Sequence, residues 1–242
     1  MWTDPVVVEN FYKKYDPKKK EYACENVNFC AGSNSITGLL GQNGAGKSTL
    51  LKAIAGFHYA TEGTISVCGC TDLPDIRKNV AFVPEIPVLD RSLTVKELLF
   101  LEASLSGNEG SQSCRGIVDR AVEICALNEV FLERVSKLSR GFLQRVSLAK
   151  SICRKTKVIV MDEFSSGLDP VQNALIRRQI VELAKTKTII LSTHHIEEAQ
   201  NLCNKVYIMT KGMIACNGTI DEVVSFSGCR NLEEAFIRLT GN

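Results

Sequence analysis

The chain has 242 residues, 45% of them hydrophobic and 23% charged, a balance ordinary for a globular domain with a substantial core. Its 29 Lys and Arg against 27 Asp and Glu give a formal net charge of +2, without the basic excess of nucleic-acid-binding proteins, so we expect no nucleic-acid partner. No signal-peptide pattern follows Met1, and no run reaches the about 18 apolar residues that span a bilayer, so we expect a cytoplasmic chain.

Ten cysteines are scattered along the chain without a C-x-x-C pair, and only His58, His194 and His195 are present as histidines. For a cytosolic chain this usage indicates reduced cysteines that pack as small hydrophobic side chains. We therefore predict no zinc site.

Short β-branched runs alternate with longer helix-like stretches, which is typical of an α/β domain. The predicted strands, in chain order, are Val6–Val8, Ser35–Leu40, Ala81–Val83, Val158–Met161 and Thr188–Ser192. Between Pro87 and Lys155 the strand pattern is missing, and apolar residues recur at helical spacing instead. The helices predicted there are Val95–Leu105, Gly116–Ala126 and Phe142–Cys153, with a solvent loop over 106–111. We interpret residues 87–155 as an inserted helical subdomain.

The chain beyond Asn204 carries a different pattern. Two short apolar runs, Val206–Met209 and Met213–Cys216, flank Lys211-Gly212 and predict a hairpin. An amphipathic helix follows, with its apolar side formed by Leu232, Ala235, Phe236 and Leu239. We expect this tail to pack on the core.

A glycine-rich segment after the second predicted strand fits the phosphate-binding pattern G-x-x-x-x-G-K-[ST] and precedes a helix-like stretch. Glycines let consecutive N–H groups surround phosphate oxygens at a helix N-terminus. We expect a solvent-facing Lys47 to reach the β- and γ-phosphates of ATP, and the Ser48 hydroxyl to bind Mg²⁺. The flanking strand and helix disfavour the alternative of a chance match in a glycine-rich turn. The predicted nucleotide-binding residues here are Gly41, Gln42, Asn43, Gly44, Ala45, Gly46, Lys47, Ser48 and Thr49.

Two carboxylates, Asp162 and Glu163, follow the buried strand Val158–Met161. Open α/β sheets place ligand-handling groups at such strand ends. We predict that Asp162 holds Mg²⁺ and that Glu163 polarises the attacking water; a solvated acidic turn is the alternative.

These motifs and four other features resemble the ABC ATPase family over nearly the whole chain. Leu138-Ser139-Arg140-Gly141-Phe142, followed by Leu143-Gln144-Arg145, is similar to the family's signature loop, and Ser166-Gly167-Leu168-Asp169 is similar to its D-loop. The resemblance implies a P-loop NTPase core of the ABC type over residues 1–86 and 156–242, with an N-terminal antiparallel β region. It also implies a single domain over 1–242, with the signature loop in the helical subdomain.

The resemblance further implies roles for single residues. Tyr15 stands where the family has an aromatic residue that stacks on adenine, and Tyr12 is the alternative. His194 stands where the family has the switch histidine that contacts the γ-phosphate, and His195 is the alternative. Lys47, Glu163 and His194 would be the catalytic residues. Ser139 and Gly141 would meet the γ-phosphate of the opposite subunit.

The sequence departs from the family pattern at four positions. Glu85 replaces the usual metal-contacting glutamine, although a carboxylate oxygen can still ligate Mg²⁺. Arg140 replaces a glycine and Phe142 a glutamine in the signature loop, and Phe164 replaces the proline after Glu163. These departures resemble the ABC-2-type exporter branch.

Partners follow from the same resemblance. We expect a second ABC ATPase subunit, as a homodimer or a heterodimer, and integral membrane permease subunits that the chain meets from the cytoplasmic face. The expected function is the ATP-hydrolysing motor of a transporter, most consistent with export. The alternatives are a non-transport ABC ATPase, such as an iron–sulfur assembly factor, and a regulatory module that binds ATP without turnover.

Overall fold

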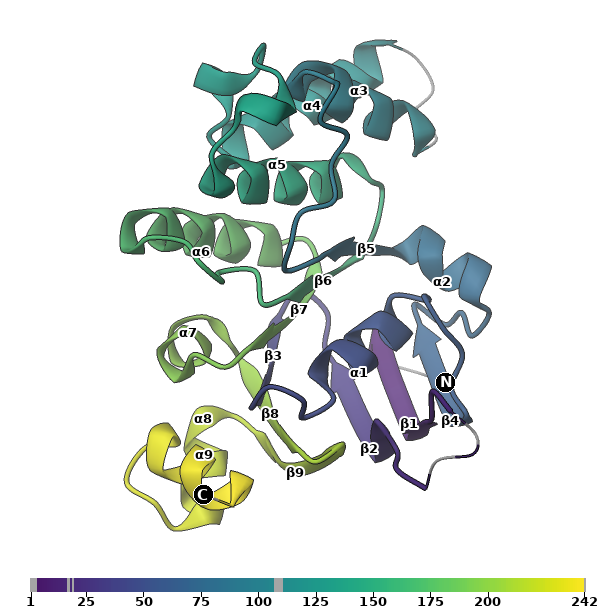
Figure 1. The fold of residues 1–242 in the computed structure, drawn as a ribbon, viewed down its shortest axis with the longest axis vertical. Helices are drawn as coiled ribbons and strands as arrows, with labels where there is room; N and C mark the ends of the chain where they lie inside the picture. The colour runs from purple at the N-terminus through teal and green to yellow at the C-terminus, as the bar shows by residue number, and fades with distance from the viewer. Residues whose placement is uncertain (1–3, 17, 19, 107–110, 242) are drawn as a thin grey trace.

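The computed structural model describes residues 4–16, 18, 20–106 and 111–241, and a six-stranded sheet lies at the centre of this part of the chain (Figure 1). The strands lie in the order β5-β6-β7-β3-β8-β9, and only the β8–β9 pair is antiparallel. Their bounds are Ile36–Gly41 for β3, Val80–Val83 for β5, Val158–Asp162 for β6, Thr188–Thr193 for β7, Lys205–Thr210 for β8 and Met213–Gly218 for β9. The parallel strands are buried on both faces, which explains their continuous apolar runs.

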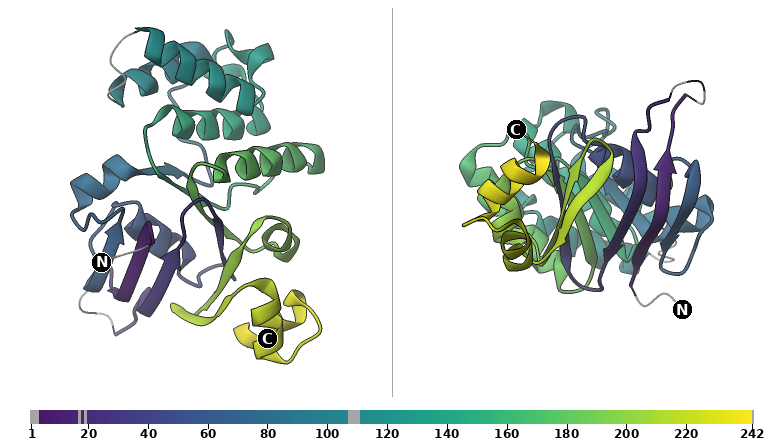
Figure 2. Two further views of the ribbon diagram at one scale, coloured as in Figure 1. Left: turned by 180° about the vertical axis from the view of Figure 1, so that it is seen from behind. Right: turned by 90° about the horizontal axis from the view of Figure 1, so that it is seen from below.

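A second, antiparallel sheet packs across helix α1, Lys47–Ile54, from the first. Its strands are β1 Val6–Lys13, β2 Cys24–Ala31 and β4 Glu62–Val67, in the order β2-β1-β4. Leu51 and Ile54 of α1 are fully buried in one cluster with Phe11 of the small sheet and Val160 of the large one. The right-hand view of Figure 2 shows the small sheet beside the large one. The two sheets therefore clamp the helix that begins at the phosphate loop.

The other face of the large sheet is covered by helices (Figure 1). α6, Pro170–Ala184, lies next to the sheet, and a helical layer of α3, α4 and α5 lies beyond it. The bounds of this layer are Val95–Leu105 for α3, Ser111–Ile124 for α4 and Arg140–Cys153 for α5, with 3₁₀ turns at Asn128–Val130 and Val135–Lys137. Leu99, Val118 and Leu148 join the layers in one buried cluster with Ile180 of α6.

Four short helices complete the described fold: α2 Leu73–Asn79, α7 Ile196–Leu202, α8 Ile220–Ser227 and α9 Leu232–Thr240. α8 and α9 bury Val223 and Leu232 against Leu40 and Val206 of the large sheet. Among the described residues, no helix combines the length and the apolar character needed to cross a membrane.

The α/β fold class, the N-terminal antiparallel region and the helical insertion are confirmed. All five predicted strands are present, and the predicted hairpin turns at Lys211 and Gly212, with φ of 47° and 81°. The third predicted helix begins two residues earlier than expected, at Arg140. Residues 107–110 of the predicted solvent loop lie outside the described residues. All ten cysteines are free thiols, and four are buried.

Candidate nucleotide site

The phosphate loop connects β3 to α1, and its glycines adopt backbone conformations that other residues rarely reach. Gly44 and Gly46 have φ of 81° and 104°, in the left-handed region. A β-carbon built on Gly46 would lie 2.6 Å from the carbonyl oxygen of Ala23, so only glycine fits there. The loop and the N-terminus of α1 border a cavity of about 240 Å³, which Glu85 and Glu163 also line. The arrangement directs backbone N–H groups and a helix N-terminus at one cavity, which suits a phosphate.

Lys47 is buried, with 5% of its surface exposed, so the prediction of a solvent-facing lysine is wrong. Its Nζ donates to the carbonyl oxygens of Gly41 and Gln42, at 2.6 and 3.2 Å, and lies 3.1 Å from Glu163 Oε1. These three acceptors replace water around the ammonium group. The buried charge is therefore paired and hydrogen-bonded, as a stable interior cation requires.

Asp162 ends β6 and is 7% exposed. Its Oδ1 accepts hydrogen bonds from Ser192 Oγ at 2.6 Å and from Ser48 Oγ at 3.1 Å. Ser192 Oγ in turn accepts the Glu163 N–H at 3.1 Å. Ser192 thus fixes both carboxylate residues, and sequence reasoning missed it. The signal that could have found Ser192 is a hydroxyl residue near the end of the buried strand β7, which pairs with β6.

Glu163 has a φ of 45°, which is uncommon for a residue with a side chain and marks the backbone as strained. Its second carboxylate oxygen, Oε2, lies 2.6 Å from Nδ1 of His194. His195 instead precedes α7 as its N-cap residue, and its N–H donates to Thr193 Oγ1. The structure brings His194, and not its rival His195, to Glu163.

Tyr15 lies beside the phosphate loop with 64% of its surface exposed. Its hydroxyl is 3.2 Å from Thr49 Oγ1, and its ring meets the ring of His58 edge-on at 5.8 Å. Burial lowers the pKa of His58, and the nearby charge of Lys13 adds to this effect. Tyr12 is half-buried and packs edge-on against Tyr22. The open ring beside the loop is therefore that of Tyr15.

Glu85 follows β5 and lines the phosphate-loop cavity. Its Oε1 accepts a hydrogen bond from Ser166 Oγ at 3.3 Å. The side chain is exposed, so it can turn toward a ligand in the cavity without a large desolvation cost.

Ser139 and Gly141 do not line this cavity. Ser139 caps α5, where its Oγ accepts the Phe142 N–H at 3.5 Å. Gly141 is buried against α6, because a β-carbon built there would lie 2.6 Å from Nε2 of Gln172. The signature loop therefore lies apart from the phosphate loop of its own chain.

The oxygen donors at the cavity fit Mg²⁺. Ser48 Oγ and the Asp162 carboxylate lie together at the base of the loop, and Mg²⁺ usually takes one or two protein oxygens and completes its shell with phosphate and water. Within the described part of the chain, no cluster of three or more His, Cys, Asp or Glu side chains offers a complete metal cage. A cation that shares its ligands with a phosphate substrate suits this site better than a structural metal.

Comparisons with known proteins agree with this geometry. Residues 24–166 match the family described as ABC transporter. The chain is 34% identical over 230 residues to the Nod factor export ATP-binding protein I of Paraburkholderia xenovorans (strain LB400), covering 91% of this chain and 75% of that protein. It is 32% identical over 216 residues to the uncharacterized ABC transporter ATP-binding protein YxlF of Bacillus subtilis (strain 168), covering 89% and 71%. A solved structure of an ATP binding subunit of an ABC transporter superposes with a TM-score of 0.87 at 28% identity, covering 97% of this chain and 99% of that one.

Proposed function

The chain belongs to the ABC transporter family of ATP-binding proteins, and from this membership we propose roles for its residues and partners. As the ATP-hydrolysing subunit of a transporter, it binds ATP and couples hydrolysis to substrate movement through membrane subunits. The observation that supports the residue roles best is the shared cavity of the phosphate loop and Glu163, with Glu163 bonded to His194. We propose one domain, with a core over 1–86 and 156–242 and a helical subdomain over 87–155.

In the proposed site, the phosphates of ATP lie on the N–H groups of residues 41–49 and adenine stacks on Tyr15. Ser48 and Asp162 would hold Mg²⁺, with Glu85 in reach, and this ion would supply neutralising charge to the phosphate oxygens.

Glu163 acts as general base on the attacking water. His194 orients the carboxylate of Glu163 and contacts the γ-phosphate. Lys47 leaves Glu163 for the β- and γ-phosphates, where its charge stabilises a loose transition state. Until the phosphates compete for the ammonium group, Lys47 Nζ lies 3.1 Å from Glu163 Oε1 and occupies that carboxylate oxygen.

A second copy of the chain completes the site. Ser139 and the Gly141 backbone lie at the N-terminus of α5, away from the phosphate cavity of their own chain. Two copies arranged head to tail would place each signature loop on the ATP of the other. A heterodimer with a related chain would use the same contacts.

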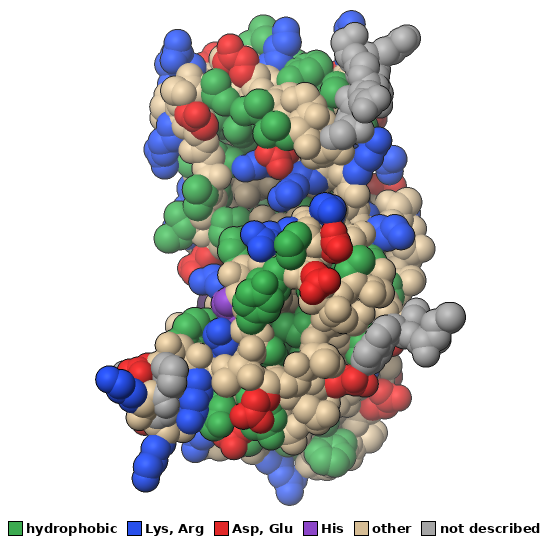
Figure 3. Space-filling model, turned by 90° about the vertical axis from the view of Figure 1, so that its right-hand side faces the viewer, with side chains coloured by type: hydrophobic (Ala, Val, Ile, Leu, Met, Phe, Trp, Pro, Cys, Tyr) green, Lys and Arg blue, Asp and Glu red, His purple; other side chains and the backbone are tan. Residues whose placement is uncertain are grey.

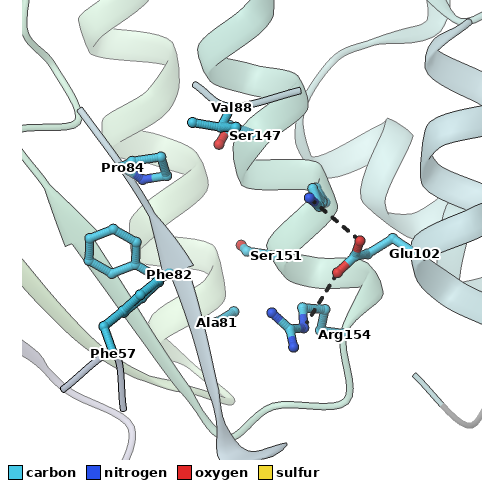
Figure 4. A pocket seen from close by; sticks show the side chains of 10 residues that line it. Phe57, Ala81, Phe82, Pro84, Val88, Glu102, Ser147, Ser151 and Arg154 are labelled. Atoms are coloured by element: carbon cyan, nitrogen blue, oxygen red, sulfur yellow. Dashed lines mark ion pairs between the residues drawn. The ribbon is translucent and has the colours of Figure 1, made fainter. Parts of the chain in front are cut away.

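A groove between the large sheet and the helical layer suits a segment of the membrane subunit. Its volume is about 380 Å³, and in Figure 4 the strand with Ala81 and Phe82 forms one side and the helix with Ser147 and Ser151 the other. Figure 3 shows Lys and Arg side chains gathered at mid-height on this face of the molecule, with hydrophobic side chains among them. The groove therefore combines apolar and basic surface.

Charge and exposure at the groove indicate which partner fits. Glu102 pairs with both Lys150 and Arg154, at 3.6 and 3.4 Å, which leaves one positive charge in excess. Phe57 and Val88 are 63% and 78% exposed on the apolar side. We propose that a short cytoplasmic helix of a permease, with apolar residues and a carboxylate, docks here and places the chain on the cytoplasmic face of the membrane. The name of the Nod factor export relative supports export as the direction.

Phosphate release by the purified chain with Mg²⁺ and ATP tests the motor role, because a regulatory module would bind ATP without turnover. Coexpression with a candidate permease subunit tests the groove. Arg154→Glu is expected to abolish copurification and to leave the hydrolysis of the isolated chain unchanged, whereas Lys185→Glu, at an exposed lysine outside the groove, retains both. Equal copurification of both variants would contradict the groove assignment, and copurification with a soluble assembly scaffold instead would favour the iron–sulfur alternative.

A further inference from the structure

Arg140, the residue that replaces a glycine in the signature loop, packs on the D-loop of its own chain. A β-carbon built on Gly167 would lie 2.5 Å from Cζ and 2.9 Å from Nη2 of Arg140, with Nη1 nearer still. The guanidinium plane therefore covers Gly167 and fills the space that a side chain there would take. Gly167 also has a φ of 70°, so both its conformation and its neighbour require glycine.

The D-loop residue next to this contact connects to the hydrolytic side of the site. The Ser166 N–H donates to the carbonyl oxygen of Glu163 at 3.0 Å, and its Oγ donates to Glu85 at 3.3 Å. Gly141 adds a contact between the signature loop and α6, the helix that follows the D-loop, because it packs on Gln172 in the first turn of α6. A continuous set of contacts thus runs from the signature loop to the turn that holds Glu163.

Electrostatics do not explain the position of Arg140. Arg140 takes part in none of the ion pairs among the described residues, although its side chain is exposed. It also lies at the first position of α5, where the helix dipole disfavours a positive charge. Packing on Gly167 is the contact that this residue makes instead, and a glycine at position 140 would lose it.

We propose that Arg140 is a positioning residue that couples the two ATP sites of the assembled dimer. This inference rests on the proposed function, in which the signature loop contacts the ATP of the opposite subunit while Glu163 acts on the ATP of its own. Closure of the signature loop on one ATP then shifts the D-loop through Arg140 and Gly167, and with it the turn of Glu163 at the other ATP.

Steady-state ATP hydrolysis by the assembled transporter, measured against ATP concentration, tests this coupling. The parent is expected to hydrolyse ATP cooperatively. Arg140→Gly should bring the Hill coefficient to about 1 and raise the half-saturating ATP concentration about fivefold. A merely structural role would lower the melting temperature without changing the Hill coefficient. Arg91→Gly, at an exposed arginine of another loop, is the matched control and should behave as the parent.

A double-mutant cycle with Gly167→Ala checks that Arg140 acts through the D-loop. Alanine at 167 displaces the guanidinium, so it should lower cooperativity in the parent and change it little in the Arg140→Gly background, because backbone strain at 167 is common to both. Equal effects in both backgrounds would overturn the proposal. If Arg140→Gly does not fold, Arg140→Met replaces it in the same cycle.

The outcomes separate this inference from the proposed function. A parent that hydrolyses no ATP refutes both. A parent that hydrolyses ATP without cooperativity, or an Arg140→Gly variant with the parental Hill coefficient, overturns the coupling role alone.

Discussion

At the scale of single residues, both carboxylate oxygens of Glu163 are occupied by basic side chains. Oε1 lies 3.1 Å from Lys47 Nζ and Oε2 lies 2.6 Å from His194 Nδ1. A carboxylate held this way is well oriented, because each of its two oxygens has a side-chain partner. A phosphate group that attracts Lys47 would leave the carboxylate to His194 and to water. The geometry therefore links the access of water to Glu163 to occupation of the phosphate loop.

Lys47→Ala should abolish ATP hydrolysis or reduce it by at least about 100-fold, because the variant removes the positive charge beside the phosphates. The fold should remain, since Glu163 keeps His194 and borders an open cavity. Phosphate release and nucleotide binding measure the effect, and circular dichroism checks the fold. Lys52→Ala, at an exposed lysine of the same helix, should retain activity. Undiminished hydrolysis by folded Lys47→Ala would refute the phosphate-loop assignment.

Glu85→Gln should retain hydrolysis within about tenfold, or ~1.4 kcal/mol, of the parent. The Ser166 hydroxyl can donate to an amide oxygen as well as to a carboxylate, and either oxygen can meet Mg²⁺. Asp162→Asn is the contrasting variant and should lose far more, because Asp162 is buried and accepts two hydroxyl hydrogen bonds. A thousandfold loss in Glu85→Gln would assign the carboxylate a role of its own.

At the scale of elements, the sequence predicts those whose burial leaves a continuous apolar run or a clear helical spacing. The central strands and the hairpin are of this kind. β2 and β4 were not predicted, because β2 carries a left-handed Asn26 and β4 begins with three exposed residues. Both depend on pairing with β1 across long stretches of chain. Local patterns do not encode such pairing.

The same distinction applies to the candidate site. The spacing of the phosphate loop and the paired carboxylates are local, so the sequence predicts them. Three other contacts join residues that are far apart in the chain. Ser192 donates a hydrogen bond to Asp162, Gly141 packs on Gln172, and Arg140 packs on Gly167. Burial of Lys47 likewise depends on Glu163, a distant residue, so the prediction of a solvent-facing lysine was wrong.

Helix α3 gives a prediction at this scale. Thr94 and Glu97 form a capping box, in which Thr94 Oγ1 accepts the Glu97 N–H at 3.2 Å and the Glu97 carboxylate accepts the Thr94 N–H at 2.8 Å. Thr94→Ala should lower the free energy of unfolding by about 1 kcal/mol, because one N–H loses its acceptor. Urea unfolding measures the change, and Thr94→Ser should keep most of the stability. An unchanged midpoint in Thr94→Ala would mean that water replaces the cap.

At the scale of the whole molecule, the phosphate loop and the signature loop of one chain lie apart. The sheets clamp α1 and fix the phosphate loop, whereas the helical layer holds Ser139 outside the cavity of the same chain. A single chain therefore offers a binding surface for ATP and a separate, unmatched signature loop. In the proposed dimer, a second subunit closes the site around ATP, and ATP would become part of the interface.

Glu163→Gln tests this arrangement, because it removes the base and keeps the size and hydrogen bonding of the side chain. The variant should lose ATP hydrolysis and retain ATP binding, so ATP should persist between Lys47 of one subunit and Ser139 of the other. Bound ATP favours the dimer by mass action, and the variant should shift from monomer to dimer with ATP but not with ADP. Size-exclusion chromatography with light scattering measures the shift. Hydrolysis at the parental rate would show that Glu163 is not the base. An inactive variant that stays monomeric would contradict the homodimer and point to a different chain as the natural partner.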